Sequence, residues 1–172
     1  MIQASDYFLD DIEKFLQINR KVNREAERKI VQNILDVQDK ISIFKGIEPQ
    51  ELKAIIYNLK FVKYKFKDYI IKQDDISEEI FYIISGGCHV FHDNLKVGEL
   101  GQGEVFGEAG AIFKTKRNAS VVCASQELTI LSFNINGDNM DFCAPALARL
   151  YKNLALQINT KLESINCAYV KK

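Results

Sequence analysis

The chain lacks an excess of basic residues. Its 23 lysines and arginines are balanced by 23 aspartates and glutamates. Phosphate contacts supply most of the affinity of nucleic-acid binders, so such proteins usually carry a basic excess, and this balance argues against DNA or RNA as a partner. The basic run between Arg20 and Lys29 is interrupted by Glu25 and Glu27, and we interpret it as a solvated helix face.

The chain also lacks the apolar segments of a membrane or secreted protein. No apolar run is long enough to cross a bilayer, and residues 1–6 do not begin a basic segment followed by an apolar run. The 4 cysteines form no Cys-x-x-Cys pair and are expected to be reduced thiols. We therefore expect a cytoplasmic protein with no membrane partner.

Histidine is scarce, which argues against a metalloenzyme. An enzyme of the cupin type needs several histidines and a glutamate around one metal ion. The 2 histidines of this chain, His89 and His92, are three positions apart on an expected strand and so point to opposite faces. The same placement leaves no Ser–His–Asp arrangement. We expect neither a metal site nor an enzyme.

Hydrophobic periodicity divides the chain into three parts. Apolar residues at helical spacing predict helices over 1–45. Residues 46–136 open with a short helix at Pro49 and continue as short strands separated by turns, which is typical of an antiparallel barrel. Helical spacing returns over 137–172. The sequence predicts an α+β fold, an antiparallel β jelly-roll barrel flanked by N-terminal helices and a long C-terminal helix. The expected strands are 61–66, 69–73, 80–84, 88–92, 95–100, 121–122 and 128–133.

An apolar stripe runs along the expected C-terminal helix from Leu147 to Ile165. Such a stripe is suited to cover the mouth of the barrel or to pair with the same helix of a second copy. Both alternatives remain open. We therefore interpret residues 137–172 as a lid or a dimerisation segment, and a homodimer is a candidate assembly.

A glycine-rich segment between two expected strands is the strongest candidate for a binding site. Gly107 and Gly110 let the backbone approach a ligand, and a helical turn opening at Glu108 would present free N–H groups to an anion. The Arg117 guanidinium suits two phosphate oxygens, and the Glu108 carboxylate suits a pair of sugar hydroxyl donors. A plain Glu108–Arg117 salt bridge fits the same residue types equally well.

The order of these residues resembles the phosphate-binding cassette of the cyclic nucleotide-binding domain family. That family includes regulatory subunits of protein kinase A, nucleotide-gated channels and the bacterial catabolite activator. Its cassette reads Phe-Gly-Glu, a small or apolar pair, a short loop and then Arg-x-Ala-Ser/Thr, which residues 106–108 and 117–120 match. Residues 44–47 and 81–86 resemble flanking features of the family, and the similarity covers about 41–165.

The resemblance implies a role for each residue of the cassette. Glu108 would bind the ribose 2′-hydroxyl, and Arg117 would pair with the cyclic phosphate. The N–H groups of Ala109 and Gly110 would meet the same phosphate, and Ser120 would support the cassette. The full set of implied ligand-binding residues is Gly107, Glu108, Ala109, Gly110, Arg117, Asn118, Ala119 and Ser120.

The identity of the base depends on fewer residues. Asn118 stands where members selective for cyclic GMP often have Thr, and its amide can bond either purine. In the bacterial activator the C-terminal helix contacts the base, which makes Asn159 and Thr160 candidates for base contacts. Tyr151 and Tyr169 are alternative stacking caps, and for each of the four taken singly we favour an ordinary exposed helix face. We expect cyclic AMP as the ligand, with cyclic GMP as the alternative.

Together these features predict a sensor that binds a cyclic nucleotide and signals to an unknown protein effector by moving helices. A ligand can do this only if it binds one helix arrangement better than the other. One alternative is a degenerate jelly-roll scaffold with an idle pocket, which the cost of burying an unpaired Glu108 and Arg117 opposes. Another is a truncated sensor domain of a larger regulator.

Overall fold

The structure, a computed structural model, describes residues 32, 36, 38, 41–56, 59–135 and 144–170. Most of the predicted N-terminal helical segment, 1–45, lies outside these residues, and so does the predicted boundary at 136–137. The division into three segments therefore stays a prediction. No helix in the described part of the chain is both long enough and apolar enough to span a membrane.

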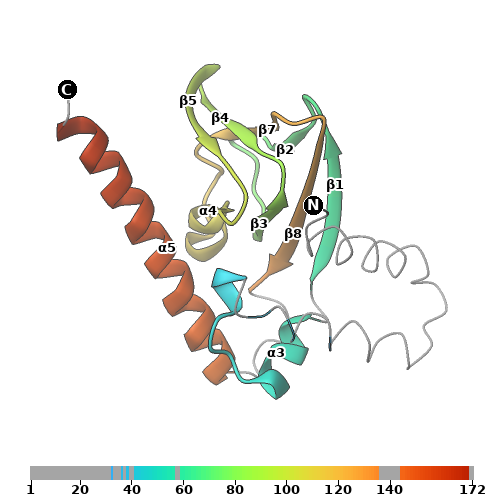
Figure 1. Cartoon of the computed structure of the whole chain (residues 1–172). Coiled ribbons are helices and arrows are strands. Elements are labelled where there is room, and N and C mark those ends of the chain that lie inside the picture. Colours follow the sequence, from blue (N-terminus) through green and yellow to red (C-terminus); the bar gives the residue numbers. More distant parts are fainter. Residues whose placement is uncertain are drawn as a thin grey trace, which may run out of the picture.

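Two antiparallel sheets of four strands each form the body of the fold (Figure 1). One sheet has the order β1-β8-β3-β6 and the other has the order β2-β7-β4-β5. This arrangement confirms the predicted antiparallel jelly roll with a long C-terminal helix. The strands are β1 Lys60–Lys65, β2 Tyr69–Ile71, β3 Glu79–Ser85, β4 Cys88–His92, β5 Leu95–Leu100, β6 Val105–Phe106, β7 Ser120–Cys123 and β8 Glu127–Asn134.

The β4–β5 hairpin shows how the turn residues set the register. His92 pairs with Leu95, so the loop contains only Asp93 and Asn94. Both loop residues have positive φ, 48° and 64°. A two-residue hairpin of this kind needs two left-handed residues, and Asp and Asn accept that conformation more readily than most side chains. The turn predicted at these two residues is confirmed.

Helical elements flank the sheets at one end and along one side (Figure 1). A 3-10 helix, η2 (Ser42–Phe44), precedes α3 (Pro49–Ile56), where Pro49 occupies the first helical position without losing a hydrogen bond. The short helix α4 (Glu108–Phe113) joins β6 to the loop before β7. The long helix α5 (Ala144–Val170) runs past the sheets.

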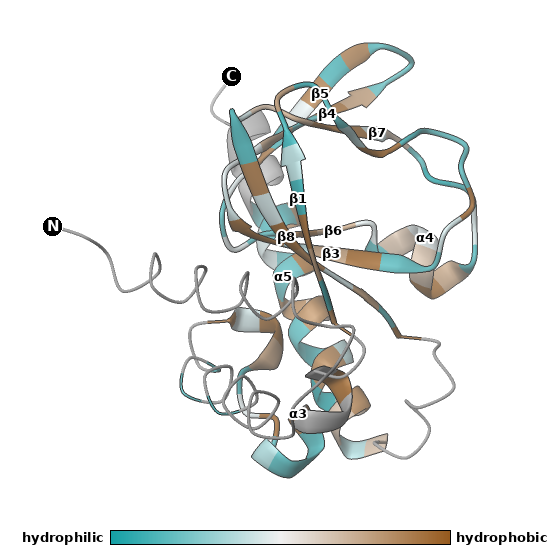
Figure 2. Cartoon of the chain, turned by 90° about the vertical axis from the view of Figure 1, so that its right-hand side faces the viewer, coloured by the Kyte–Doolittle hydropathy of each residue, from teal (hydrophilic) through white to brown (hydrophobic). Residues whose placement is uncertain are grey.

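Two apolar clusters hold these elements together. The first lies between the sheets and includes Phe81, Ile83 and Leu128. The second joins the sheet β1-β8-β3-β6 to η2, α3 and α5, with Leu52 and Leu150 fully buried. Figure 2 shows the apolar residues gathered where α3 and the first half of α5 meet the sheet. The first half of α5 is therefore part of the core.

Candidate functional site

The glycine-rich segment forms a tight turn that leads into α4. Gly107 has φ of 79° and precedes the helix, whose first residue is Glu108. The main-chain oxygen of Gly107 accepts the N–H of Ala111 over 3.3 Å, which closes the first turn. The first N–H groups of a helix have no intrahelical acceptor, so those of Glu108, Ala109 and Gly110 are available to a ligand. The helical turn expected at 108–110 is confirmed and extends to Phe113.

Arg117 is buried against this turn. Its side chain is 4% exposed. Nη1 donates to the main-chain oxygen of Gly107, and Nη2 donates to the main-chain oxygen of Glu79 over 2.6 Å. The guanidinium carbon lies 5.9 Å from the centre of the Phe81 ring. The arginine thus points into the barrel wall beside the start of α4 and away from bulk water.

The charge of Arg117 is only partly compensated in the described residues. Its hydrogen bonds go to main-chain oxygens and not to a carboxylate, so the structure does not contain the alternative Glu108–Arg117 salt bridge. Its Nε is buried and has no hydrogen-bond partner among those residues. Burial lowers the pKa of Arg117, and the fields of Glu79, Glu108 and Asp75 oppose that shift. A buried donor without an acceptor is unfavourable, so the unpartnered Nε makes Arg117 a candidate binding residue.

Two glycines make room for the guanidinium. A Cβ at Gly107 would lie 2.8 Å from Nη1 of Arg117, and a Cβ at Gly110 would lie 3.1 Å from Cδ and from Nη1. Real Cβ contacts are rarely so short, so a side chain at either position would push Arg117 aside. We expected these glycines to admit a ligand. In the structure the group that they admit is the arginine itself.

Main-chain bonds fix the loop that carries Arg117. Its N–H donates to the oxygen of Asp75, and its oxygen accepts the N–H of Asp74, both over 2.9 Å. The hydroxyl of Ser120 accepts the N–H of Gln73 over 2.9 Å. Ser120 therefore ties β7 to the end of β2, and its role as a support of the cassette stays a prediction.

Asn118 and Ala119 lie between the arginine and β7. Asn118 is exposed, and its main-chain oxygen is 2.7 Å from Nδ1 of His92. Ala119 is half-buried.

His89 is 3.7 Å from a carboxylate oxygen of Glu99, so the two histidines have separate partners. Within the described residues, no three His, Cys, Asp or Glu side chains are grouped to hold a metal ion.

The structure does not bring Asn159 and Thr160 to the cassette. The amide of Asn159 donates to Glu163 over 2.8 Å, and the hydroxyl of Thr160 donates to the main-chain oxygen of Leu156 over 3.0 Å. Both residues are exposed, and Figure 2 shows α4 well to one side of α5. Tyr151 on the same helix is 37% exposed. The alternative cap, Tyr169, lies outside the residues whose side chains are described.

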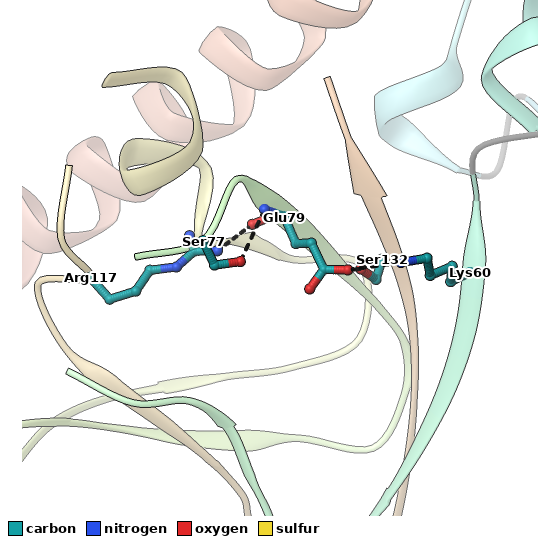
Figure 3. A network of polar contacts seen from close by, with 5 residues as sticks. All are labelled: Lys60, Ser77, Glu79, Arg117 and Ser132. Carbon is teal, nitrogen blue, oxygen red and sulfur yellow. Dashed lines mark hydrogen bonds and ion pairs between the residues drawn. The ribbon is translucent and has the colours of Figure 1, made fainter. Parts of the chain in front are cut away.

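Sequence reasoning missed Glu79, which links the arginine to the sheet (Figure 3). The main-chain oxygen of Glu79 accepts the hydrogen bond from Arg117. Its carboxylate accepts a hydrogen bond from the Ser132 hydroxyl over 3.0 Å, and Nζ of Lys60 lies 3.5 Å from the same carboxylate oxygen. The N–H of Glu79 donates to the Ser77 hydroxyl over 3.3 Å. The arginine uses a main-chain oxygen, which every residue type has, so the sequence holds no signal for this contact.

Comparison with known proteins finds relatives that are similar to this chain in sequence. The family model described as the cyclic nucleotide-binding domain matches residues 61–137. A cGMP-dependent protein kinase of Toxoplasma gondii is 27% identical over 154 residues, which cover 90% of this chain and 14% of the kinase. The chain thus spans about one seventh of the length of that relative.

Solved structures agree with the fold. The crystal structure of a cyclic nucleotide-binding domain from Methylobacillus flagellatus superposes with a TM-score of 0.67 at 17% identity, covering 84% of this chain and 85% of that one. The regulatory subunit of a cAMP-independent protein kinase A from Trypanosoma brucei superposes with a TM-score of 0.63 at 19% identity, covering 82% and 51%. Residues 61–137, which contain α4 and Arg117, thus match the cyclic nucleotide-binding domain family, and the solved structures share its fold.

Proposed function

We propose that the turn at Gly107, the start of α4 and Arg117 together bind the cyclic phosphate of a cyclic nucleotide. The observation that carries the proposal is the buried Arg117, whose Nε lacks an acceptor in the described residues. Glycines at 107 and 110 leave room for this guanidinium beside the start of α4. Two kinds of donor, a guanidinium and helix-terminal amides, therefore meet at one place, and both favour a phosphate.

A cyclic phosphate suits the charge of the site. Its single negative charge would balance the positive charge of Arg117. The carboxylates of Glu79, Glu108 and Asp75 also act electrostatically on the guanidinium, but the hydrogen bonds of Arg117 go to main-chain oxygens. A phosphate dianion would meet the same carboxylates with one more negative charge. The site is therefore expected to prefer the monoanionic diester over a 5′-monophosphate.

Glu108 is the proposed partner of the ribose. It is the first residue of α4, half-buried, and lies next to the amides proposed for the phosphate. In a cyclic nucleotide the 2′-hydroxyl is adjacent to the ring that holds the phosphate, so one short segment can bind both groups. A carboxylate accepts a hydrogen bond from that hydroxyl and does not compete for the phosphate.

Cyclic AMP is the first candidate ligand and cyclic GMP the second. The sequence favoured cyclic AMP, while the Toxoplasma relative is a kinase named for its dependence on cGMP. Asn118 is exposed beside Arg117, and its amide both donates and accepts, so it suits either purine. Asn159 and Thr160 remain proposed base contacts for a state in which α5 has moved toward α4.

We propose that the chain acts as a regulatory module and not as an enzyme. Nucleotide binding would shift α4 and α5, and the change would pass to a protein effector, since a ligand shifts an equilibrium by its differential affinity for two states. The cytoplasmic location, the absence of a nucleic-acid or membrane partner, and the homodimer stay predictions.

Calorimetric titration tests this function. The chain is titrated with cyclic AMP, cyclic GMP and 5′-AMP, the last as a matched linear phosphate. We expect saturable binding of at least one cyclic nucleotide and binding of 5′-AMP at least about tenfold weaker. If neither cyclic nucleotide binds at millimolar concentration, the alternative of an idle jelly-roll scaffold replaces the proposal.

A further inference from the structure

The two halves of α5 are attached to the barrel in different ways. In the first half, Ala146, Leu150 and Leu154 are no more than 1% exposed and belong to the core. Beyond Leu154, Leu156 and Leu162 are 57% and 53% exposed. Among the described side chains of α5, Leu154 is thus the last buried apolar residue, and polar contacts attach the helix beyond it.

Those contacts come from one polar face of the helix. At the junction, the Asn153 amide donates to the main-chain oxygens of Ile43 and Lys45 over 3.0 and 2.9 Å. One turn later, Gln157 donates to the Ser42 hydroxyl, with the main-chain oxygen of Gly103 at 3.5 Å.

One further turn along, Lys161 donates to the main-chain oxygen of Val105. Positions 153, 157 and 161 are four residues apart, which places them on one face of α5. This face therefore reaches η2 first and then the turn between β5 and β6.

A cavity of about 430 Å³ lies beside these contacts. It separates the second half of α5 from η2 and from the turn between β5 and β6. Polar side-chain tips, and not interlocking apolar groups, thus bridge this part of the interface. Residues lining the cavity include Ser42, Lys45, Gly103, Glu104, Leu156 and Thr160.

We infer that Gln157 and Lys161 form a latch that holds the second half of α5 away from α4 and thereby opposes nucleotide binding. This inference rests on the proposed function. The acceptor of Lys161 is Val105, two residues before Gly107, so the latch is attached to the strand that leads into the cassette.

Hydrogen bonds of this kind have modest net strength, so binding at the cassette is able to break them. For a nucleotide that needs α5 near α4, the apparent affinity equals the intrinsic affinity multiplied by the fraction of molecules in which the latch is open.

A reversible cross-link tests the latch. The Gln157 amide reaches the Ser42 hydroxyl through a side chain longer than that of cysteine, so a short bis-methanethiosulfonate reagent, which a reductant removes, is used to join the two cysteines of the double variant Ser42→Cys/Gln157→Cys. The double variant also carries Cys143→Ser and Cys167→Ser, which remove two native thiols. The control carries Ser42→Cys alone in the same background. Affinity is measured with cyclic AMP and cyclic GMP before and after reduction.

The latch predicts at least about tenfold weaker binding by the cross-linked double variant than by the same protein after reduction. Equal affinity in the two forms would overturn the latch and leave the proposed function standing. Absence of binding by the wild-type protein would instead remove the proposed function and the latch together.

A second pair of variants has the opposite expected sign. Gln157→Ala/Lys161→Met removes the latch and is expected to raise nucleotide affinity about threefold or more. Lys152→Met removes a charge from an exposed position of the same helix and should leave affinity unchanged. A purely structural role for Gln157 and Lys161 predicts unchanged or lower affinity in the double variant, and either result contradicts the latch.

Discussion

Nη2 of Arg117 donates to the main-chain oxygen of Glu79 over 2.6 Å, which ties the arginine of the cassette to the first residue of β3. Figure 3 shows the same glutamate reaching Ser132 through its carboxylate. Ser132 belongs to β8, which pairs with both β1 and β3 in the centre of its sheet. The guanidinium is therefore positioned by the rigid part of the barrel, and the arginine does not have to be ordered when a ligand arrives.

Gly110→Ala is predicted to displace Arg117. The added Cβ would lie 3.1 Å from Cδ and Nη1 of the arginine, whose side chain is itself buried. We expect the free energy of unfolding to fall by about 1–3 kcal/mol and cyclic nucleotide affinity to fall with it. Gly98→Ala is the control, because a Cβ there meets nothing within 4 Å. Chemical denaturation and calorimetry measure the two effects, and similar behaviour of both variants would contradict this role of Gly110.

Glu108→Gln is predicted to weaken binding through the ribose alone. A hydrogen bond to a charged group contributes about 1.5–3 kcal/mol, so we expect about 10- to 100-fold lower affinity for a cyclic ribonucleotide. The matched ligand is the 2′-deoxy form, which lacks the hydroxyl and should bind wild type and variant almost equally. An equal loss for both ligands would show that Glu108 acts on some other part of the nucleotide.

Leu154→Ala is predicted to loosen α5 from the core. Leu154 is 1% exposed, and truncating a buried leucine lowers the free energy of unfolding by about 2–5 kcal/mol. Leu162→Ala, on the same helix but 53% exposed, should change it by less than about 0.5 kcal/mol. Denaturant titration compares the two. Comparable losses of unfolding free energy in the two variants would mean that Leu162 is also packed against the protein. That result would contradict the latch, in which polar contacts hold this part of α5.

Stability is predicted to fall at alkaline pH because of Cys88. Burial raises the pKa of its thiol from 9.0 to about 12, and burial also raises the pKa of Tyr64 and Tyr82. Below pH 9 the thiol is protonated in the folded and unfolded states alike. Between pH 9 and 12 only the unfolded chain releases the proton, so the free energy of unfolding decreases as pH rises.

The check on this prediction is the melting temperature across the same pH range. Cys88→Ala should show a shallower decline than the wild-type protein, because one of the shifted groups has been removed. Identical slopes would mean that Cys88 is accessible to water in the folded state.

The fold was largely predictable because its signals are local. The strand 88–92, the strand 95–100 and the turn between them result from alternation of apolar residues and from two residues suited to positive φ. Among the remaining strands, β6 (Val105–Phe106) was not expected, and the others differ from expectation at their ends. Glu79 and Ser85, for example, extend β3 by pairing with Asn134 and Thr129, and such pairing depends on the neighbouring strand and not on residue type.

The proximity of Gly107, Gly110 and Arg117 was predictable, but the hydrogen bonds of the site were not. The order of Glu108 and Arg117 indicated one cassette, and the structure places Gly107, Gly110 and Arg117 in contact. The acceptor at Glu79 is a main-chain atom that no sequence pattern marks. The position of α5 also escaped prediction, because the polar face at 153, 157 and 161 binds main-chain oxygens distant in sequence.

Arg117→Lys, compared with wild type by calorimetric titration, tests the central claim most directly. Lysine keeps the positive charge but loses the planar fork and the Nε donor, so a phosphate bound by that fork should bind about 30-fold more weakly or worse. Lys116→Met, a neighbouring change at an exposed position, should have little effect. We expect a large loss of affinity in Arg117→Lys and also a lower melting temperature, because lysine cannot keep both hydrogen bonds to Gly107 and Glu79. Unchanged affinity for cyclic AMP and cyclic GMP in a folded Arg117→Lys variant would contradict the assignment of Arg117 to the phosphate.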